Sequence, residues 1–243
     1  MESFDRYARD YDELLDDPLR QKFAGDGAFF IQQKCRVLMR HLKARMPVGG
    51  QLRLLDAGCG QGTAIAFLGS QARVIGTDVS LPMVREAVRS GPVAVQEPFD
   101  LPFADGTFDA AYAFCVYHHI DDAQHVRHLR ELRRVLAPGG RVCIFEHNPF
   151  NPVTRRIFER APVDRGCHMI KPARLRQVFA EAGLEAVEQG YLLFLPQKLW
   201  KWLGFIEPAL AWLPLGGQYF VSGRKGSKPL TLVETRSTDG QSL

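Results

Sequence analysis

The stretch L-R-L-L-D-A-G-C-G-Q-G, residues 52–62, decides how the rest of the chain folds. Its apolar run ends in Asp56 and gives way to three glycines, a pattern typical of a buried parallel strand that turns tightly into a helix. Gly58 and Gly60 permit positive φ angles and leave the backbone open to a ligand, while Gly62 lets the next helix begin close to the strand. Free N–H groups at such a turn bind an anion or a carboxylate. The stretch indicates a nucleotide site, although a glycine-rich turn alone also serves structural loops.

A second short strand follows about twenty residues later and also ends in an acid. Residues 74–78 read V-I-G-T-D, and Asp78 stands where a carboxylate can bind both hydroxyls of a ribose. Helices expected over 63–70 and 81–89 alternate with the strands, which predicts a parallel sheet with right-handed crossovers. Because the carboxyl ends of neighbouring parallel strands meet at one edge, Asp56 and Asp78 are expected in the same crevice.

Three further segments complete the pattern. They read L-P-F-A-D-G-T-F-D (101–109), Y-H-H-I (117–120) and E-L-R-R-V-L-A-P-G-G (131–140), the last closing a helix expected over 122–136 that the proline and glycines stop. With the glycine stretch they resemble, in order, the class I S-adenosylmethionine-dependent methyltransferases. The resemblance covers residues 50–147. It implies an α/β fold with a Rossmann-like seven-stranded sheet, mostly parallel with an antiparallel last strand, and helices on both faces.

The resemblance also implies S-adenosylmethionine as the cofactor and S-adenosylhomocysteine as the product. Asp78 would bind the ribose, and the glycine loop would hold the methionine portion. The adenine amino group would meet Glu97, with Asp100 as the competing candidate, and Phe99 either stacks on the base or packs in the core. Pro98 offers no N–H to the adenine ring. The residues expected to contact the cofactor are Asp56, Gly58, Cys59, Gly60, Gly62, Asp78, Val79, Met83, Glu97, Pro98, Phe99, Phe114, Cys115, His119 and Tyr11.

Two candidates for catalysis stand at the carboxyl end of the fifth predicted strand. His147 is the leading candidate for an acid or base, and Glu146 would orient His147 or the substrate. The adjacent His118 and His119 follow the fourth strand, but adjacent side chains project differently and no acid with suitable ligand spacing accompanies them. Five scattered cysteines form no CxxC pair. We therefore expect no metal site and interpret His118 and the other histidines of this region mostly as capping or surface groups.

The chain is expected to consist of a core and two flanking parts. An amphipathic helix is predicted over 1–17, interrupted near Pro18. It packs on the core or, as the resemblance implies, forms a lid in which Tyr7 and Tyr11 touch the cofactor or substrate. The predicted parts are an N-terminal helical lid (1–48), a methyltransferase domain (49–224) with substrate-side insertions at 148–172 and 191–217, and a disordered tail (225–243).

The segment 191–217 is rich in apolar residues and holds all three tryptophans. Lys198, Lys201 and Glu207 interrupt it, together with prolines, so it lacks the unbroken run that a membrane-spanning helix needs. Three interpretations remain open: a cover for an apolar substrate, which we favour, a homodimer surface, or a segment that lies in a membrane interface.

Composition limits the range of acceptors. The 243 residues carry 31 basic and 27 acidic side chains, a net charge of +4 that is too small and dispersed to favour nucleic acid. Basic residues gather over 151–176, which either favours an acidic acceptor or forms a solvated helix face. We expect methyl transfer to an oxygen, nitrogen or carbon of a small or lipid-like molecule. The alternatives are a protein or nucleic-acid acceptor and a non-catalytic partner that retains the fold. The polar N-terminus has no secretion-signal pattern, which favours the cytoplasm.

Overall fold

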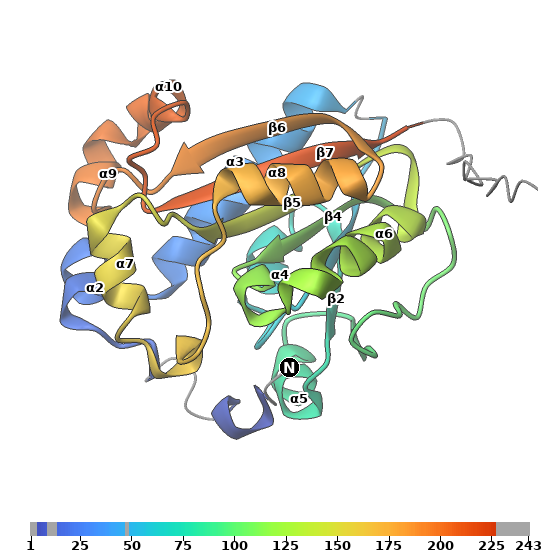
Figure 1. Ribbon diagram of the computed structural model, residues 1–243, viewed down its shortest axis with the longest axis horizontal. Helices are drawn as coiled ribbons and strands as arrows, with labels where there is room; N and C mark the ends of the chain where they lie inside the picture. The colour runs from blue at the N-terminus through green and yellow to red at the C-terminus, as the bar shows by residue number, and fades with distance from the viewer. Residues whose placement is uncertain (1–3, 9–13, 47–48, 227–243) are drawn as a thin grey trace, which may run out of the picture.

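The chain folds around one seven-stranded sheet in the computed structural model, which describes residues 4–8, 14–46 and 49–226 (Figure 1). The strands are β1 (Arg53–Ala57), β2 (Arg73–Asp78), β3 (Val93–Val95), β4 (Phe108–Phe114), β5 (Leu136–His147), β6 (Leu184–Leu192) and β7 (Gln218–Lys225). The α-helices are α2 (Pro18–Phe23), α3 (Ala28–Arg45), α4 (Thr63–Leu68), α5 (Leu81–Ala87), α6 (His125–Val135), α7 (Pro152–Phe158), α8 (Pro172–Glu181), α9 (Gln197–Leu203) and α10 (Glu207–Leu210). Short 3-10 helices are η1 (Phe4–Tyr7), η2 (Tyr117–His119), η3 (Asp122–Gln124), η4 (Pro162–Asp164) and η5 (Gly204–Ile206).

The strand order is β3-β2-β1-β4-β5-β7-β6. Neighbouring strands pair in parallel from β3 to β5, whereas β7 is antiparallel to both β5 and β6. The predicted fold class is therefore confirmed, including the antiparallel last strand. The chain order reverses between β1 and β4, and ligands bind at such a switch point beside the carboxyl ends of the strands.

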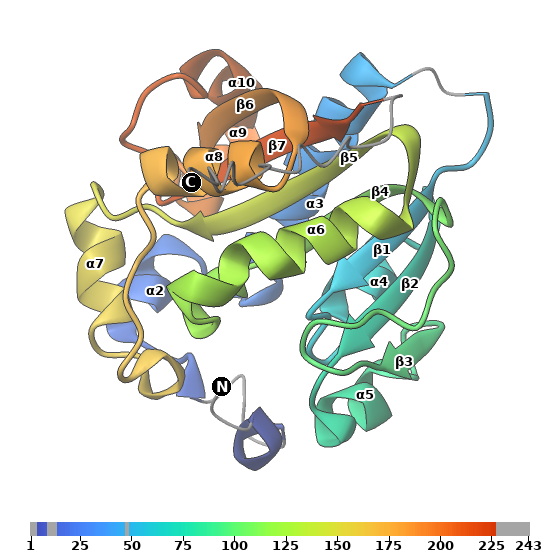
Figure 2. The same cartoon turned by 45° about the vertical axis from the view of Figure 1, so that its right-hand side comes forward.

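Both faces of the sheet are buried, which explains why its central strands are almost wholly apolar. Successive residues on one strand point to opposite faces: Leu54 belongs to the core beneath α3 and α4, while Leu55 belongs to the core beneath α6 and α8. Figures 1 and 2 show these two helix pairs on either side of the sheet. The two cores hold the strand ends rigidly, and the loops at those ends carry the polar residues.

The fifth strand begins earlier than the sequence predicts. The helix expected over 122–136 is divided into η3 and α6, and β5 already begins at Leu136 rather than after the glycines. Leu136 pairs with Phe108, and the register then shifts so that Arg141 pairs with Ala110. Gly140 fits this irregularity because an added Cβ would lie 2.8 Å from the Asp109 carbonyl oxygen. The proline and glycines therefore form an irregular part of the strand.

Pro18 begins a helix instead of interrupting one. Over residues 4–8 the predicted long helix is replaced by the short η1 and a turn, whereas Leu14 is helical and residues 9–13 lie outside the described part. Asp17 caps α2 by accepting a hydrogen bond from the Leu19 N–H at 2.8 Å, and Pro18 occupies the first helical position, where its missing N–H costs nothing. Tyr11 lies outside the described residues.

Candidate functional site

The glycine loop after β1 has the backbone that the sequence predicts. Gly58, Gly60 and Gly62 have φ angles of 78°, 53° and 81°, in the left-handed region. The N–H groups of Gly58 and Cys59 donate to the Thr77 carbonyl at 2.8 and 2.9 Å, which ties the loop to β2. A Cβ on Gly58 would lie 2.7 Å from Val116, whereas one on Gly60 would meet open space. Gly60 therefore leaves the loop accessible to a ligand.

Asp78 lies beside this loop at the end of β2. Its carboxylate accepts one hydrogen bond from the Gly60 N–H and another from the Ser80 N–H, each at 2.9 Å. Burial raises the pKa of Asp78, and these backbone donors oppose the shift. A crevice of about 110 Å³ lies against the carboxylate, and the predicted residues Val79, Met83 and Pro98 also line it. Four of the residues predicted to contact the adenosine, Asp78, Val79, Met83 and Pro98, therefore meet at this cavity.

Glu97 does not reach this crevice, contrary to the sequence-based assignment. Its side chain is exposed, as is that of Asp100, and neither residue lines the crevice. Phe99 packs edge-on against His128, with ring centroids 6.3 Å apart, and does not line the crevice either. The preceding residue, Gln96, is buried and lines the crevice, and its Oε1 has no hydrogen-bond partner in the structure. Because neighbouring residues beside a strand end project to opposite sides, Gln96 faces the crevice and Glu97 faces away from it.

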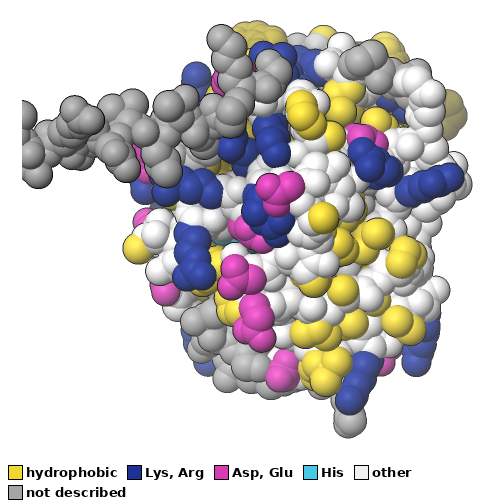
Figure 3. Space-filling view, turned by 90° about the vertical axis from the view of Figure 1, so that its right-hand side faces the viewer, with side chains coloured by type: hydrophobic (Ala, Val, Ile, Leu, Met, Phe, Trp, Pro, Cys, Tyr) yellow, Lys and Arg dark blue, Asp and Glu magenta, His cyan; other side chains and the backbone are white. Residues whose placement is uncertain are grey.

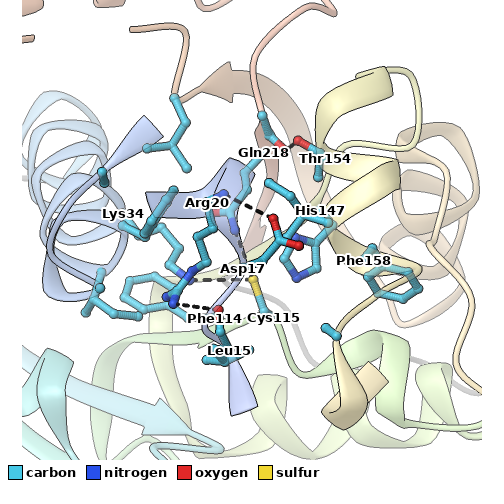
Figure 4. Close-up of a pocket in the computed structure, with 18 of the residues that line it drawn as sticks. Leu15, Asp17, Arg20, Lys34, Phe114, Cys115, His147, Thr154, Phe158 and Gln218 are labelled. Atoms are coloured by element: carbon cyan, nitrogen blue, oxygen red, sulfur yellow. Dashed lines mark hydrogen bonds between the residues drawn. The ribbon is translucent and has the colours of Figure 1, made fainter. Parts of the chain in front are cut away.

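A larger chamber of about 990 Å³ adjoins the crevice (Figure 4). Asp56 and the glycine loop lie in its wall, and burial raises the pKa of Asp56 to about 7. One oxygen of this carboxylate, Oδ2, has no hydrogen-bond partner in the structure. Phe114, Cys115 and His119, all predicted to approach the cofactor, line both the crevice and the chamber. The two cavities therefore share a wall.

Polar groups converge on Cys115 at this shared wall. Cys115 has a φ of 58°, and its Sγ lies 3.5 Å from Lys34 Nζ and 3.3 Å from Gln218 Nε2. Lys34 Nζ also lies 5.1 Å from the centroid of the Phe114 ring. Figure 4 shows these side chains directed to the same part of the chamber. Gln218 is a site residue that the sequence does not reveal, because β7 follows β5 by about seventy residues and only their antiparallel pairing brings it here.

Glu146 pairs with a different histidine from the one expected. His118 Nδ1 lies 2.7 Å from Glu146 Oε2, and its Nε2 lies 3.2 Å from Asp164 Oδ1. Burial alone would lower the pKa of His118, but these two carboxylates raise it to about 10. Burial would likewise raise the pKa of Glu146, but His118 lowers it to about 2. An imidazolium thus lies between two carboxylates, and Glu146 orients His118 rather than His147.

The interpretation of the neighbouring histidines as capping or surface groups is wrong for three of them. His118, His125 and His128 are buried. His125 Nε2 lies 2.9 Å from the Tyr117 carbonyl, and His128 Nδ1 lies 2.9 Å from the Tyr117 hydroxyl. Both contacts have the same target, Tyr117 in the short turn η2, and they hold this turn against α6.

His147 and His119 face the chamber as neutral groups. Burial, followed by the positive charge of His118, lowers the pKa of each to about 4. The His147 ring lies 5.2 Å from that of His118 and 5.5 Å from that of Phe158, measured between centroids. His147 therefore carries a free lone pair at neutral pH and lies in the chamber wall.

An acid, Asp164, lies beside His118 and His147 in the tertiary structure, although the sequence shows no acid at a suitable spacing. Asp164 is 46 residues from His118, and potential ligand atoms of Asp164, His118 and His147 lie within 4.8 Å of one another. Sequence spacing could not reveal this set, because η4 reaches the end of β5 only through the fold. The expectation of no metal site stays a prediction.

The N-terminal segment contacts the glycine loop and the start of α5. Ser80 Oγ lies 2.7 Å from Asp5 Oδ1, and Gln61 Nε2 donates to the Ala8 carbonyl at 3.1 Å. η1 consequently lies over the crevice side of the sheet, where a lid is predicted.

Figure 3 shows basic and acidic side chains of the described residues interspersed on one face of the molecule. Within the described residues, no helix has the length and apolar character required to cross a bilayer.

The central part of the chain is similar to known methyltransferases. Residues 55–144, which include the glycine loop, Asp78 and most of β5, match a family model described as a methyltransferase domain. Residues 55–144 are thus a class I S-adenosylmethionine-dependent methyltransferase domain. The resemblance seen in the sequence is thereby confirmed.

Relatives of this methyltransferase domain share its central part. An O-methyltransferase, resE, of Aspergillus sclerotiorum is 30% identical over 171 residues, which are 62% of this chain and 61% of that protein. A 2-phytyl-1,4-naphtoquinone methyltransferase of Synechococcus elongatus is 35% identical over 159 residues, 57% of this chain and 65% of that protein. The chain thus spans less than two thirds of the length of either relative.

Among solved structures, a methyltransferase of Thermotoga maritima, described as a possible histamine N-methyltransferase, matches with a TM-score of 0.66. At 19% identity, the match covers 91% of this chain and 98% of that one. This likeness supports the fold of the methyltransferase domain and no finer property.

Proposed function

We propose that the methyltransferase domain transfers the methyl group of S-adenosylmethionine to an oxygen, nitrogen or carbon nucleophile of a small organic molecule held in the chamber. The observation that carries this proposal is the wall shared by crevice and chamber. Phe114, Cys115 and His119 border both cavities, so a cofactor in the crevice would present its reactive end to an acceptor in the chamber. Catalysis by such an arrangement is mainly a matter of alignment and exclusion of water.

The residues present fit this cofactor. Two buried polar atoms without partners point to it: Gln96 Oε1 at the crevice would accept from the adenine amino group, and Asp56 Oδ2 at the chamber would accept from the methionine ammonium. Asp78 would bind the ribose hydroxyls at the end of β2. Gly60 would let the methionine portion approach the backbone, because no side chain occupies that space.

The bound cofactor would supply a methyl group made electrophilic by a sulfonium. Proton removal from the acceptor falls to His147, which is neutral above a pH of about 4 and lies in the chamber wall. His118 stabilises this neutral state, because a second positive charge beside the imidazolium is unfavourable. Lys34 would stabilise negative charge that develops on the acceptor near Phe114.

The chamber also favours a class of acceptor. Apolar side chains such as Phe30, Ile31 and Phe194 line it together with Lys34 and Arg20. This combination suits an aromatic or lipid-like molecule that carries a hydroxyl or another polar head. The relatives named above, an O-methyltransferase and a phytyl-naphthoquinone methyltransferase, support the same class.

The first test is calorimetric titration with S-adenosylmethionine and S-adenosylhomocysteine. We expect binding by the wild type and its loss in Asp78→Ala, whereas Asp105→Ala, an exposed acid paired with Arg134 at 2.7 Å, binds normally. Labelled methyl transfer to a panel of phenols and quinols then tests the reaction. No binding of either ligand would contradict the proposed cofactor site. Binding without transfer to any acceptor, including protein and RNA, would favour a non-catalytic partner.

A further inference from the structure

The segment that leads from β6 to β7 presents an unusual apolar surface. Six side chains form it, and we call them the apolar rim: Val153, Leu199, Trp202, Phe205, Trp212 and Leu215. Trp202, Phe205 and Trp212 are 81%, 77% and 73% exposed. Aromatic side chains of this size seldom remain in water without a partner, so the rim marks an interaction surface.

The exposure of the rim does not come from loose packing of the segment. Trp200 packs against Phe29, with ring centroids 6.1 Å apart, and the Arg36 guanidinium lies 4.7 Å from the Trp200 ring. Glu207 is buried and accepts hydrogen bonds from the N–H groups of Phe194 and Leu195, each at 3.0 Å. One face of α9 is therefore fixed on α3, while its opposite face carries Trp202.

The rim continues into the chamber. Asn151 Nδ2 donates to the Leu215 carbonyl at 2.8 Å, and Thr154 Oγ1 donates to the Gly217 carbonyl at 3.0 Å, which fastens α7 beside the end of the segment. Val153 and Leu215 are exposed and also line the chamber. Figures 1 and 2 both place α7 on the same side of the molecule as α9 and α10. An apolar molecule on the rim would thus have an apolar path into the chamber.

Positive charges border the rim. Lys198 and Lys201 are the exposed charged side chains of residues 193–217, because the acid of that segment, Glu207, is buried. Arg155 and Arg156 of α7 are also exposed, and Glu159 lies 4.0 Å from Arg155. Tryptophans and phenylalanine with lysine and arginine beside them match the interface of a bilayer with anionic head groups.

We propose that the apolar rim docks on the surface of an anionic lipid bilayer, so that a lipid-like acceptor enters the chamber from the membrane. The identity of the acceptor rests on the proposed function, whereas the docking does not. A second copy of the chain is a poorer occupant. In a symmetric dimer the rim of one copy would face the rim of the other, which gathers the basic side chains of both copies around one interface with no exposed acid of residues 193–217 to pair with them. An anionic bilayer instead neutralises them.

The test uses the full chain with vesicles of phosphatidylcholine, alone or mixed with phosphatidylglycerol. We expect sedimentation with the anionic vesicles, a blue shift of the tryptophan emission, and weaker binding as salt rises. The variant Trp202→Ala/Phe205→Ala/Trp212→Ala is expected to bind about tenfold more weakly or worse, because each lost side chain removes buried apolar area. The matched control, Val88→Ala/Val95→Ala, removes exposed apolar groups elsewhere and is expected to bind as the wild type does.

A second pair of variants tests the charges. Lys198→Glu/Lys201→Glu is expected to lose the preference for phosphatidylglycerol, whereas Lys43→Glu, an exposed lysine on α3, keeps it. Absence of wild-type sedimentation with either vesicle, or equal binding by the aromatic triple variant, would overturn the proposal. A wild-type dimer that this variant dissociates would assign the rim to self-association and overturn it as well. Titration with S-adenosylhomocysteine without vesicles tests the cofactor site separately, so the two failures are distinguishable.

Discussion

His118 Nδ1 lies 2.7 Å from Glu146 Oε2, and this buried contact joins the turn after β4 to the end of β5. Glu146 Oε1 also accepts a hydrogen bond from the Tyr117 N–H at 2.8 Å, so one carboxylate organises the whole turn. Two strand ends that border the chamber are thereby held in one arrangement. The contact between His118 and Glu146 therefore stabilises both the fold and the wall of the chamber.

Glu146→Gln is expected to lower the free energy of unfolding by about 3 kcal/mol, because a buried imidazolium then loses one of its two carboxylates. Urea unfolding checks this value. Glu185→Gln is the matched control: it removes the carboxylate from an ion pair with Arg224 in which the Arg224 and Glu185 side chains are 48% and 58% exposed, and is expected to cost at most about 1 kcal/mol. Equal losses in the two variants would show that the buried pair has no special role.

The affinity for S-adenosylhomocysteine is expected to depend on pH through Asp56. Burial raises the pKa of this carboxyl to about 7, and an ammonium requires the ionised form. The affinity should therefore be highest above pH 7 and fall, by up to about tenfold per unit, as the pH drops below it. Calorimetry between pH 5 and 8 measures the slope. Asp56→Asn should bind more weakly with a flatter profile, and an unchanged slope in that variant would assign the titration to another group.

Substitutions at Gln96 and at Glu97 are expected to have different effects on the affinity for S-adenosylhomocysteine. Gln96→Ala is expected to weaken S-adenosylhomocysteine binding about tenfold, because a buried amide that lines the crevice is lost. Glu97→Ala is expected to bind as the wild type does, since the Glu97 side chain is exposed. A loss of affinity in Glu97→Ala alone would restore the assignment made from the sequence.

Alanine variants of Gly60 and Gly139 distinguish an effect on ligand binding from an effect of backbone strain on stability. Gly60 and Gly139 have φ angles of 53° and 79°, and a Cβ at either position meets open space. Each alanine variant is expected to lower the free energy of unfolding by about 1 kcal/mol because alanine disfavours this backbone conformation. Only Gly60→Ala is expected to lose affinity for S-adenosylhomocysteine, since the new methyl group enters the ligand space. Normal binding by Gly60→Ala would contradict the proposal that the ligand lies against the glycine loop.

No metal ion is expected between His118, His147 and Asp164, because His118 already supplies a positive charge between two carboxylates. Elemental analysis of the purified protein should find substoichiometric metal, and a chelator should leave the unfolding midpoint unchanged. A bound ion at one per chain that His147→Ala removes would contradict this expectation.

Local sequence patterns were sufficient for the sheet and for part of the site. The run that ends in Asp56, the glycines after it and Asp78 belong to one βαβ unit, so their relative positions follow from strand and turn geometry. The same locality explains why Val79 and Met83 line the crevice as expected. These features depend on residues close in sequence and on backbone conformations that few residues adopt.

Tertiary structure decided the rest. The pairing of His118 with Asp164 joins residues 46 positions apart, and Gln218 reaches Cys115 across 103 positions. Such contacts depend on how strands and helices pack, which spacing does not encode. Packing also separates Trp200, fixed against α3, from Trp202 on the apolar rim, although the two belong to the same short helix. The sequence determined where a cofactor is expected, and the fold determined which side chains line the chamber.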